Sequence, residues 1–326
     1  MDKDFFIQTS KNAIIHCFKY NYDHNYFGTG ESSGKIMIFE KNKNEFKNIF
    51  EKKIHENSIF DIAWSHLNPK FGSYLASVSY DKKVKIFDFL DIKSNQKDEP
   101  LIPCYEYIHE NCVNCCEFSP YEYGLILICG SSDGTVSIHE LFINKERKKE
   151  WKSQRIKTNI TGVNCLSFGP SFYPISFFNI NNKCNINDNI KYSPMRFSTG
   201  GCDNSIYICT CENSKIKNED KKDIFKYTFN ITELKGHKGW IRGIDWLKYA
   251  GSKYDTIASC SEDETVKIWK NKNYNWKKYE LDKTFCSPVW KVEFSPFGRY
   301  LVVLTGNDVL YFFKENNEGK WKEIIK

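Results

Sequence analysis

Long apolar runs are missing from this chain of 326 residues. No stretch approaches the roughly 18 consecutive apolar residues that a transmembrane helix requires. The N-terminal segment 1–7 also lacks the basic and then apolar pattern of a secretory signal. The sequence therefore predicts a soluble, cytoplasmic protein that does not insert directly into lipid.

Concentrated charge of one sign is missing as well. The 47 Lys and Arg residues exceed the 41 Asp and Glu residues by a net charge of +6, and these charges are spread along the chain. The one dense basic run, at 145–152, is typical of a solvated loop between strands. Because nucleic-acid binding requires a coherent basic face, we expect no nucleic-acid partner.

Motifs that carry catalysis or bind metals are also lacking. The glycines of Gly28–Gly34 have no following Lys-Ser/Thr pair, so this segment predicts a hairpin rather than a phosphate-binding loop. Cys115 and Cys116 are adjacent and point to opposite faces of one strand, which disfavours a zinc site. The 13 cysteines fit small buried thiols of a reducing compartment better than disulfides. The sequence therefore predicts no enzyme, metal, cofactor or small-molecule substrate.

A repeated phrase is what the chain has instead. Small residues and an acidic or amide residue form a turn, and an alternating apolar strand follows. The spacing is close to the ~40–45 residues of a WD repeat, lengthened by insertions. Six such units indicate six four-stranded blades, so we predict a single all-β WD40 β-propeller domain over residues 1–326. The six phrases are Ser33–Phe39, Asp81–Phe87, Asp133–His139, Asp203–Cys209, Asp263–Trp269 and Asn307–Phe313.

Polar residues that recur with the repeat predict hydrogen-bonded groups inside the blades. A WD unit has a His before its innermost strand, a Ser or Thr, the turn Asp and a closing aromatic residue. A neutral imidazole between a carboxylate and a hydroxyl satisfies these buried groups. An active site would be unique, whereas these residues recur, so we assign them a structural role. They are His55, Ser77, Asp81, His109, Asp133, Asp203, His237, Ser259, Asp263 and Trp269.

Two polar, low-complexity stretches interrupt the fourth repeat. One, at about 176–195, lies between its first and second strands, and the other, at about 212–224, follows its third strand. We expect both to be mobile surface loops rather than a second domain.

The chain has one strand more than six blades need. The segment 320–326 supplies the outer strand of the sixth blade, yet a further strand precedes the first blade. An open ring with unpaired edges and bare apolar faces invites association, so we expect a partner to supply three strands in trans. The alternative is that the sixth blade spreads and the ring closes on itself. The extra strand consists of Phe5, Phe6, Ile7, Gln8 and Thr9.

The sequences of several repeats resemble those of one family within the WD class. This is the Sec-thirteen family, the small WD-repeat propeller of the COPII outer coat, which is shared with the Y-shaped scaffold of the nuclear pore. The resemblance covers nearly the whole chain. The segments that carry it are Leu75–Asp81, Tyr123–Val136, Arg196–Asn204, Ile257–Asp263, Val289–Ser295 and Gly319–Glu323.

The resemblance implies an open propeller that accepts an insertion blade from a large α-solenoid partner, either the larger coat subunit or a nucleoporin. It implies a scaffold in ER-to-Golgi transport, at ER exit sites and COPII vesicles, or in the nuclear pore, or in both. The implied contact region is the strand at 5–9 with the gap-facing surfaces of the first and sixth blades. We expect Ile36, Ile38, Leu310 and Phe312 to be core residues near that gap.

A function from another class is the alternative. A closed WD40 propeller can act as an adaptor that recognises a degron or a modified tail at its top. Trp240 and Trp290, at the loop entries of the fifth and sixth blades, would serve such an adaptor if they are exposed. An adaptor would tolerate deletion of residues 1–10, whereas the scaffold would lose its partner.

Overall fold

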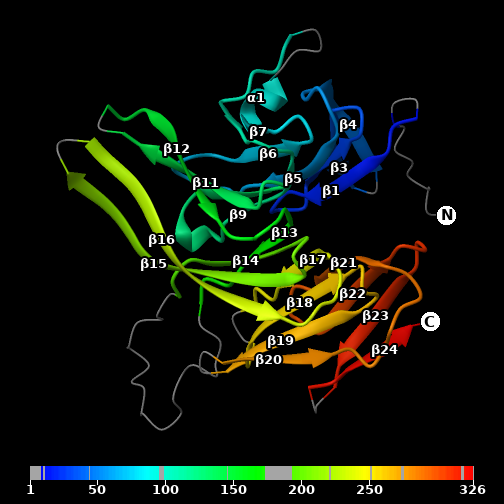
Figure 1. The fold of residues 1–326 in the computed structure, drawn as a ribbon. Coiled ribbons are helices and arrows are strands. Elements are labelled where there is room, and N and C mark those ends of the chain that lie inside the picture. Colours follow the sequence, from blue (N-terminus) through cyan, green and yellow to red (C-terminus); the bar gives the residue numbers. More distant parts are fainter. Residues whose placement is uncertain are drawn as a thin grey trace. The chain divides into compact units, whose positions relative to one another are not determined.

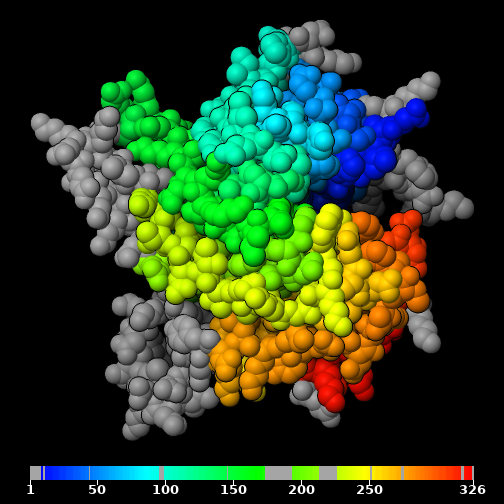
Figure 2. Space-filling view, viewed as in Figure 1, coloured from blue at the N-terminus to red at the C-terminus, as the bar shows by residue number. Residues whose placement is uncertain are grey.

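The computed structural model describes most of the chain, and Figure 2 draws the remaining residues in grey. The predicted strand at 5–9 lies outside the described residues except for Thr9, which belongs to no strand. The insertion at 176–195 lies outside them up to residue 192. The described residues are Thr9, 12–43, 45–94, 99–144, 146–172, 193–219, 222–249, 252–272, 275–316 and 319–325.

The chain divides into two compact units, Met1–Ile156 and Lys157–Lys326. The first unit contains three antiparallel sheets (Figure 1). Its first sheet has the strands β1 (Ile15–Tyr20), β2 (Tyr26–Glu31), β3 (Lys35–Asn42) and β4 (Glu45–Lys53). Its second sheet has β5 (Ile59–Trp64), β6 (Tyr74–Ser79), β7 (Lys83–Asp88) and β8 (Tyr105–Ile108). Its third sheet has β9 (Val113–Phe118), β10 (Ile126–Ser131), β11 (Thr135–Ile143) and β12 (Lys149–Lys157).

The second unit also contains three antiparallel sheets. The fourth sheet has β13 (Val163–Phe168), β14 (Arg196–Gly201), β15 (Ser205–Glu219) and β16 (Lys222–Lys235). The fifth sheet has β17 (Ile241–Trp246), β18 (Asp255–Ser261), β19 (Val266–Lys272) and β20 (Asn275–Glu280). The sixth sheet has β21 (Val289–Phe294), β22 (Tyr300–Thr305), β23 (Leu310–Glu315) and β24 (Trp321–Ile325). Six sheets of four consecutive strands confirm the six blades.

Two elements differ from the sequence-based expectation or were missed by it. The stretch at 212–224 is not a loop, because β15 and β16 continue as one paired hairpin as far as Glu219 and Lys222 (Figure 1). A polar segment can form such a ribbon because the ladder satisfies its backbone groups. The chain also forms a short helix, α1 (Phe89–Ser94), and a 3-10 turn, η1 (Tyr121–Tyr123). No helix in the described parts of the chain is long and apolar enough to cross a membrane.

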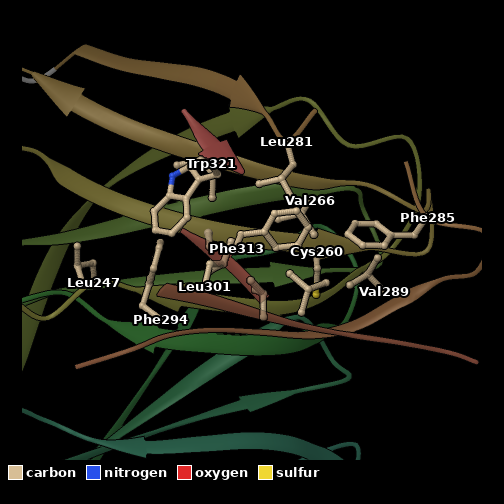
Figure 3. Close-up of a cluster of buried hydrophobic side chains, with 14 residues drawn as sticks. Leu247, Cys260, Val266, Leu281, Phe285, Val289, Phe294, Leu301, Phe313 and Trp321 are labelled. Atoms are coloured by element: carbon tan, nitrogen blue, oxygen red, sulfur yellow. The ribbon is translucent and has the colours of Figure 1, made fainter. Parts of the chain in front are cut away.

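Apolar layers between successive sheets hold each unit together. A strand whose sheet packs between two other sheets has two apolar faces. In the fifth sheet, β18 is accordingly buried along its whole length. Figure 3 shows the layer between the fifth and sixth sheets, where Cys260 and Val266 meet Leu301 and Phe313. Burial of such side chains stabilises each unit by roughly 1.5–3 kcal/mol per large residue.

A bulge recurs near the start of most inner strands. In β17 the ladder pairs Ile241 with Ser261 and then Gly243 with Cys260, so Arg242 is the extra residue. In β21 the same irregularity leaves Trp290 as the extra residue. A bulge redirects a side chain out of the regular alternation. The side chain of the second residue in each such strand therefore departs from the regular alternation at that end of its sheet.

Candidate partner-binding surface

The first sheet has an aromatic face on the side away from the second sheet. Strand β1 alternates, with Cys17 packed toward the second sheet and Phe18 and Tyr20 on the opposite side. These two rings lie 4.8 and 5.6 Å from the ring of Phe27, which stacks on Phe39 at 4.7 Å. Phe18 is 44% and Tyr20 39% exposed. This face offers aromatic surface beyond what the sheets of the first unit use.

The sixth sheet has a comparable face on the side away from the fifth sheet. Leu301, Val303 and Phe313 point into the layer of Figure 3, so the alternate residues of β22 and β23 point the other way. The ladder pairs Val302 with Phe312 and Leu304 with Leu310 on that side. Leu310 is 53% exposed, and the other three are partly buried. An apolar cluster of this kind is typical of an interaction site.

The four residues that we expected to be core near the gap fall into two groups. Ile36 and Ile38 are fully buried, but they pack on the second sheet, so they lie on the wrong side of β3. The other side of that strand carries Met37 and Phe39. Leu310 and Phe312 lie on the outward face of the sixth sheet, where Leu310 is exposed rather than core. A strand with two apolar faces has no sequence signal that tells one face from the other.

The outer position of the sixth sheet is filled by the chain's own last strand. β24 pairs with β23, and the sheet order is β21-β22-β23-β24. The first sheet is likewise complete with β1-β2-β3-β4. Phe5, Phe6, Ile7 and Gln8 lie outside the described residues and Thr9 is half-buried, so the extra strand stays a prediction. Neither end sheet needs a strand from another part of the chain.

The fifth repeat contains the complete hydrogen-bonded group. His237 Nδ1 donates to Asp263 Oδ2 at 3.0 Å, because a carboxylate only accepts. Its Nε2 then accepts from the hydroxyl of Ser259 at 2.8 Å. Trp269 Nε1 donates to the same hydroxyl oxygen at 2.9 Å. Burial lowers the pKa of His237 despite the opposing effect of Asp263, so the imidazole is neutral and structural.

The second repeat has the same arrangement without the indole. His55 Nδ1 donates to Asp81 at 2.9 Å, and its Nε2 accepts from Ser77 at 2.8 Å. Burial raises the pKa of Asp81, but the hydrogen bond from His55 and those from the backbone N–H groups of Lys83 and Glu56 outweigh this and lower it to about 2. Phe87 closes the strand and is buried. The group therefore has a structural role in this blade too.

The third repeat departs from the pattern. His109 Nε2 lies 2.8 Å from Ser137 Oγ, and His139 Nε2 lies 2.8 Å from the same oxygen. Asp133 Oδ2 is 3.7 Å from His109 Nδ1, which is too long for a hydrogen bond. A hydroxyl both donates and accepts, so Ser137 can donate to one neutral imidazole and accept from the other. The repeat pattern indicated His109 and Asp133 but gave no signal for Ser137.

The fourth repeat replaces the imidazole by an amide. Asn159 Nδ2 donates to Asp203 Oδ1 at 3.2 Å, and the Thr199 hydroxyl donates to Asn159 Oδ1 at 2.8 Å. An amide can bridge a carboxylate and a hydroxyl as an imidazole does, because it has both a donor and an acceptor. Asp203 therefore keeps its predicted place in the blade.

Replacing Trp269 by phenylalanine is expected to lower the free energy of unfolding by about 1–2 kcal/mol. The ring fits, because Phe87 takes this place in the second repeat, but Ser259 loses a hydrogen-bond donor. Urea denaturation measures the difference. Trp276→Phe is the matched control, since its indole is only partly buried in the layer between the fourth and fifth sheets. An equal loss in both variants would contradict a specific role for the indole N–H.

Trp240 and Trp290 both lie close to Arg242, and both are exposed as the adaptor hypothesis requires. The guanidinium carbon is 5.1 Å from the Trp240 ring centre and 5.0 Å from that of Trp290. Such distances are typical of cation–π contacts.

Comparison with family models places the chain in the WD class. The "WD domain, G-beta repeat" family matches residues 46–88, 103–140 and 229–270. These segments contain His55, His109 and His237, so the match falls on the three repeats that keep the histidine. A chain of the "Crystal Structure of Mitotic Checkpoint Complex" superposes with a TM-score of 0.65 at 14% identity, over 94% of this chain and 76% of that one. This likeness shows the β-propeller fold alone.

Curated relatives are more specific. "Protein SEC13 homolog" of Drosophila melanogaster is 32% identical over 322 residues, 98% of this chain and 82% of the relative. "Protein transport protein sec13" of Aspergillus clavatus is 32% identical over 324 residues, 95% of this chain and 98% of the relative. The resemblance to the Sec-thirteen family is thereby confirmed. The chain belongs to the Sec13 family of WD-repeat β-propeller proteins, a family of protein transport that is non-enzymatic.

Proposed function

We propose that this protein is a structural subunit of the COPII outer cage in ER-to-Golgi transport, a nuclear pore scaffold component, or both. In this role the propeller is open and accepts an insertion blade from a large α-solenoid partner. One observation carries the proposal. The first and sixth sheets are each complete with their own four strands, and each has exposed apolar side chains on the side away from its neighbour in the same unit, Phe18 and Tyr20 on the first and Leu310 on the sixth.

The chemistry of the two faces suits a blade supplied in trans. Phe18 and Tyr20 offer aromatic surface on the first sheet, and Leu310 and Phe312 offer aliphatic and aromatic surface on the sixth. Three strands of the partner would pair with the strand that the sequence predicts at 5–9 and bury both faces. Strand addition gives affinity through backbone hydrogen bonds, and side-chain contacts give specificity. An obligate interface of this kind buries roughly 2,000 Å² or more.

The function follows from stiffness. The partner's blade would pack against the first sheet on one face and the sixth sheet on the other. Such a blade resists bending, because packed protein interiors have low compressibility. The rod-like partner that threads the propeller is then rigid where it passes through. A rigid edge helps a cage impose curvature on a membrane without contact with lipid. We therefore infer a cytoplasmic protein that is peripheral on ER exit sites and COPII vesicles, at the nuclear pore, or at both.

Affinity purification of the tagged chain from its own cells tests this function. A stoichiometric α-solenoid protein that stays bound in high salt is the expected result, and mass spectrometry identifies it as coat subunit or nucleoporin. Deletion of residues 1–10 and Leu310→Glu should each remove it, because one removes the pairing strand and the other places a charge in the apolar interface.

The matched control is Phe297→Glu, which places the same charge on another exposed apolar residue of the second unit. This variant should keep the partner. If the wild-type chain purifies as a clean monomer, or if the deletion leaves the partner bound, trans completion is excluded. Recovery of substoichiometric peptide-like partners alone would favour the closed adaptor.

A further inference from the structure

The second unit has a surface cluster that the blade interface does not use, and we call Trp240, Arg242 and Trp290 the tryptophan–arginine cluster. Trp240 is 45% and Trp290 44% exposed, although tryptophan is normally largely buried. Trp290 turns toward Arg242 of the fifth sheet and therefore lies apart from the outward face of the sixth sheet. The cluster is thus separate from the apolar face around Leu310.

Local backbone geometry fixes the cluster. Arg242 and Trp290 are the extra residues of the bulges in β17 and β21, so both side chains leave the ladder at the same end of adjacent strands. A Cβ on Gly306 would lie 2.8 Å from Trp290 Nε1, which shows that the indole sits directly over this glycine. Trp240 is held by its carbonyl, which accepts from the Glu262 N–H at 3.0 Å. The cluster is therefore preorganised.

Glu262 orients the Arg242 guanidinium through two of its nitrogens and leaves the third without a hydrogen bond to any described residue. Arg242 Nε donates to Glu262 Oε1 at 2.8 Å, and Nη2 donates to the same oxygen. Within the described part of the protein, Nη1 and the two indole N–H groups have no acceptor. A guanidinium and an indole N–H only donate, so the group that meets them must be an acceptor. Carboxylates form the strongest such hydrogen bonds with arginine.

Charge around the cluster is compatible with an acidic ligand. Lys238 and Lys291 are exposed neighbours in sequence of the two tryptophans. The acidic groups nearby are Glu262, already bound to Arg242, Glu293, which lies 3.7 Å from Lys291 Nζ, and Asp263, which accepts from the Lys238 N–H at 2.8 Å. Basic and acidic groups are therefore equal in number, and each of the three carboxylates already has a partner in this unit. The exposed indole faces add apolar surface of the kind on which extended peptides pack.

We propose that the tryptophan–arginine cluster binds an extended acidic peptide of a partner protein. A glutamate or aspartate of that peptide accepts from Arg242 Nη1, and apolar residues on either side pack against the indoles of Trp240 and Trp290. The indole N–H groups donate to its backbone carbonyls. This gives the scaffold a second docking site on another surface from its blade interface.

Fluorescence polarisation with three labelled synthetic peptides of equal length tests the proposal on the full chain. Proline holds each probe extended, and it alternates with glutamate, lysine or serine. We expect saturable binding of the glutamate probe, weakening of that binding by added salt, and no binding of the lysine probe. Trp240→Ala and Trp290→Ala should each weaken binding of the glutamate probe at least about tenfold.

Arg242→Gln and Arg242→Lys separate charge from geometry. Both variants lose the planar guanidinium, so both should weaken binding of the glutamate probe. Arg242→Lys should weaken it less, because it keeps the positive charge. Phe297→Ala, which removes another exposed aromatic ring of this unit, is the matched control and should bind normally. Circular dichroism and the solenoid partner retained in affinity purification report that each variant is folded.

Several outcomes overturn the proposal. These are no saturable binding of the glutamate probe, equal binding of the lysine probe, or binding that the three cluster substitutions leave unchanged. Because the cluster variants are expected to keep the α-solenoid partner, failure here is distinct from failure of trans-blade completion.

Discussion

Asp255→Ala is expected to lower the free energy of unfolding by about 3–5 kcal/mol, the cost of leaving a buried charge without its partner. The carboxylate lies at the start of β18 and is fully buried. One oxygen accepts from Arg196 Nη1, and the other accepts from Trp246 Nε1 at 2.7 Å. The guanidinium also lies 5.1 Å from the Trp246 ring centre. Loss of the carboxylate removes the anion that faces the Arg196 charge and the acceptor of the Trp246 indole N–H together.

Urea denaturation monitored by tryptophan fluorescence measures this loss. The double variant Arg196→Met/Asp255→Ala no longer contains the buried positive charge of Arg196. We therefore expect it to be more stable than Asp255→Ala alone. Glu146→Ala removes an ion pair to Lys148 whose side chains are 71% and 74% exposed, and should change stability by less than about 0.5 kcal/mol. A similar small effect of Asp255→Ala would refute the assignment of this network as a clamp between the fourth and fifth sheets.

Acidification is expected to destabilise the first unit through His139. Burial and then the neighbouring His109 lower the pKa of His139 to about 3. An imidazole in the unfolded chain titrates near pH 6.5. Below that value it is protonated in the unfolded state but stays neutral in the native state. The stabilisation is complete above about pH 6.5 and is lost as the pH falls toward 3. For this one residue the full change is on the order of 5 kcal/mol.

The same sign applies to other groups of the blades. Burial lowers the pKa values of His55, His109 and His237, so each adds to the loss below about pH 6.5. The lowered pKa of Asp81 acts in a later window, because its contribution is present above about pH 4 and is lost as the pH falls toward 2. The unfolding free energy measured across pH 3–8 should therefore fall in a first stage from about pH 6.5 and more steeply below about pH 4.

His139→Phe isolates the first stage. The variant should show a flatter dependence of unfolding free energy on pH between about 6.5 and 4, whatever its stability at neutral pH. His24→Asn, a change at an exposed position, is the matched control and should keep the wild-type slope. An unchanged slope in His139→Phe would show that this buried imidazole does not govern the acid response.

Repetition made much of the fold predictable. The turn and strand of each phrase repeat six times, so the alternation of every strand and the fifth-repeat group from His237 to Trp269 were visible without coordinates. The polar stretch at 212–224 was misjudged as a loop, because low hydrophobicity does not distinguish a paired hairpin from irregular chain. The shared hydroxyl of Ser137 was missed for another reason, since one departure from a repeat carries no periodic signal.

The sequence by itself determined the six blades, their order and the membership of the Sec13 family, because local turns and period-two strands are encoded within each repeat. Tertiary structure decided which face each strand presents to which neighbour. Ile36 and Ile38 pack on the second sheet, while Met37 and Phe39 lie on the other side. It also paired Arg196 with Asp255, 59 positions apart, and brought Trp240 and Trp290 to one arginine. Both faces of a blade strand are apolar, and contacts between blades join residues that no repeat relates, so only the packed sheets resolve them.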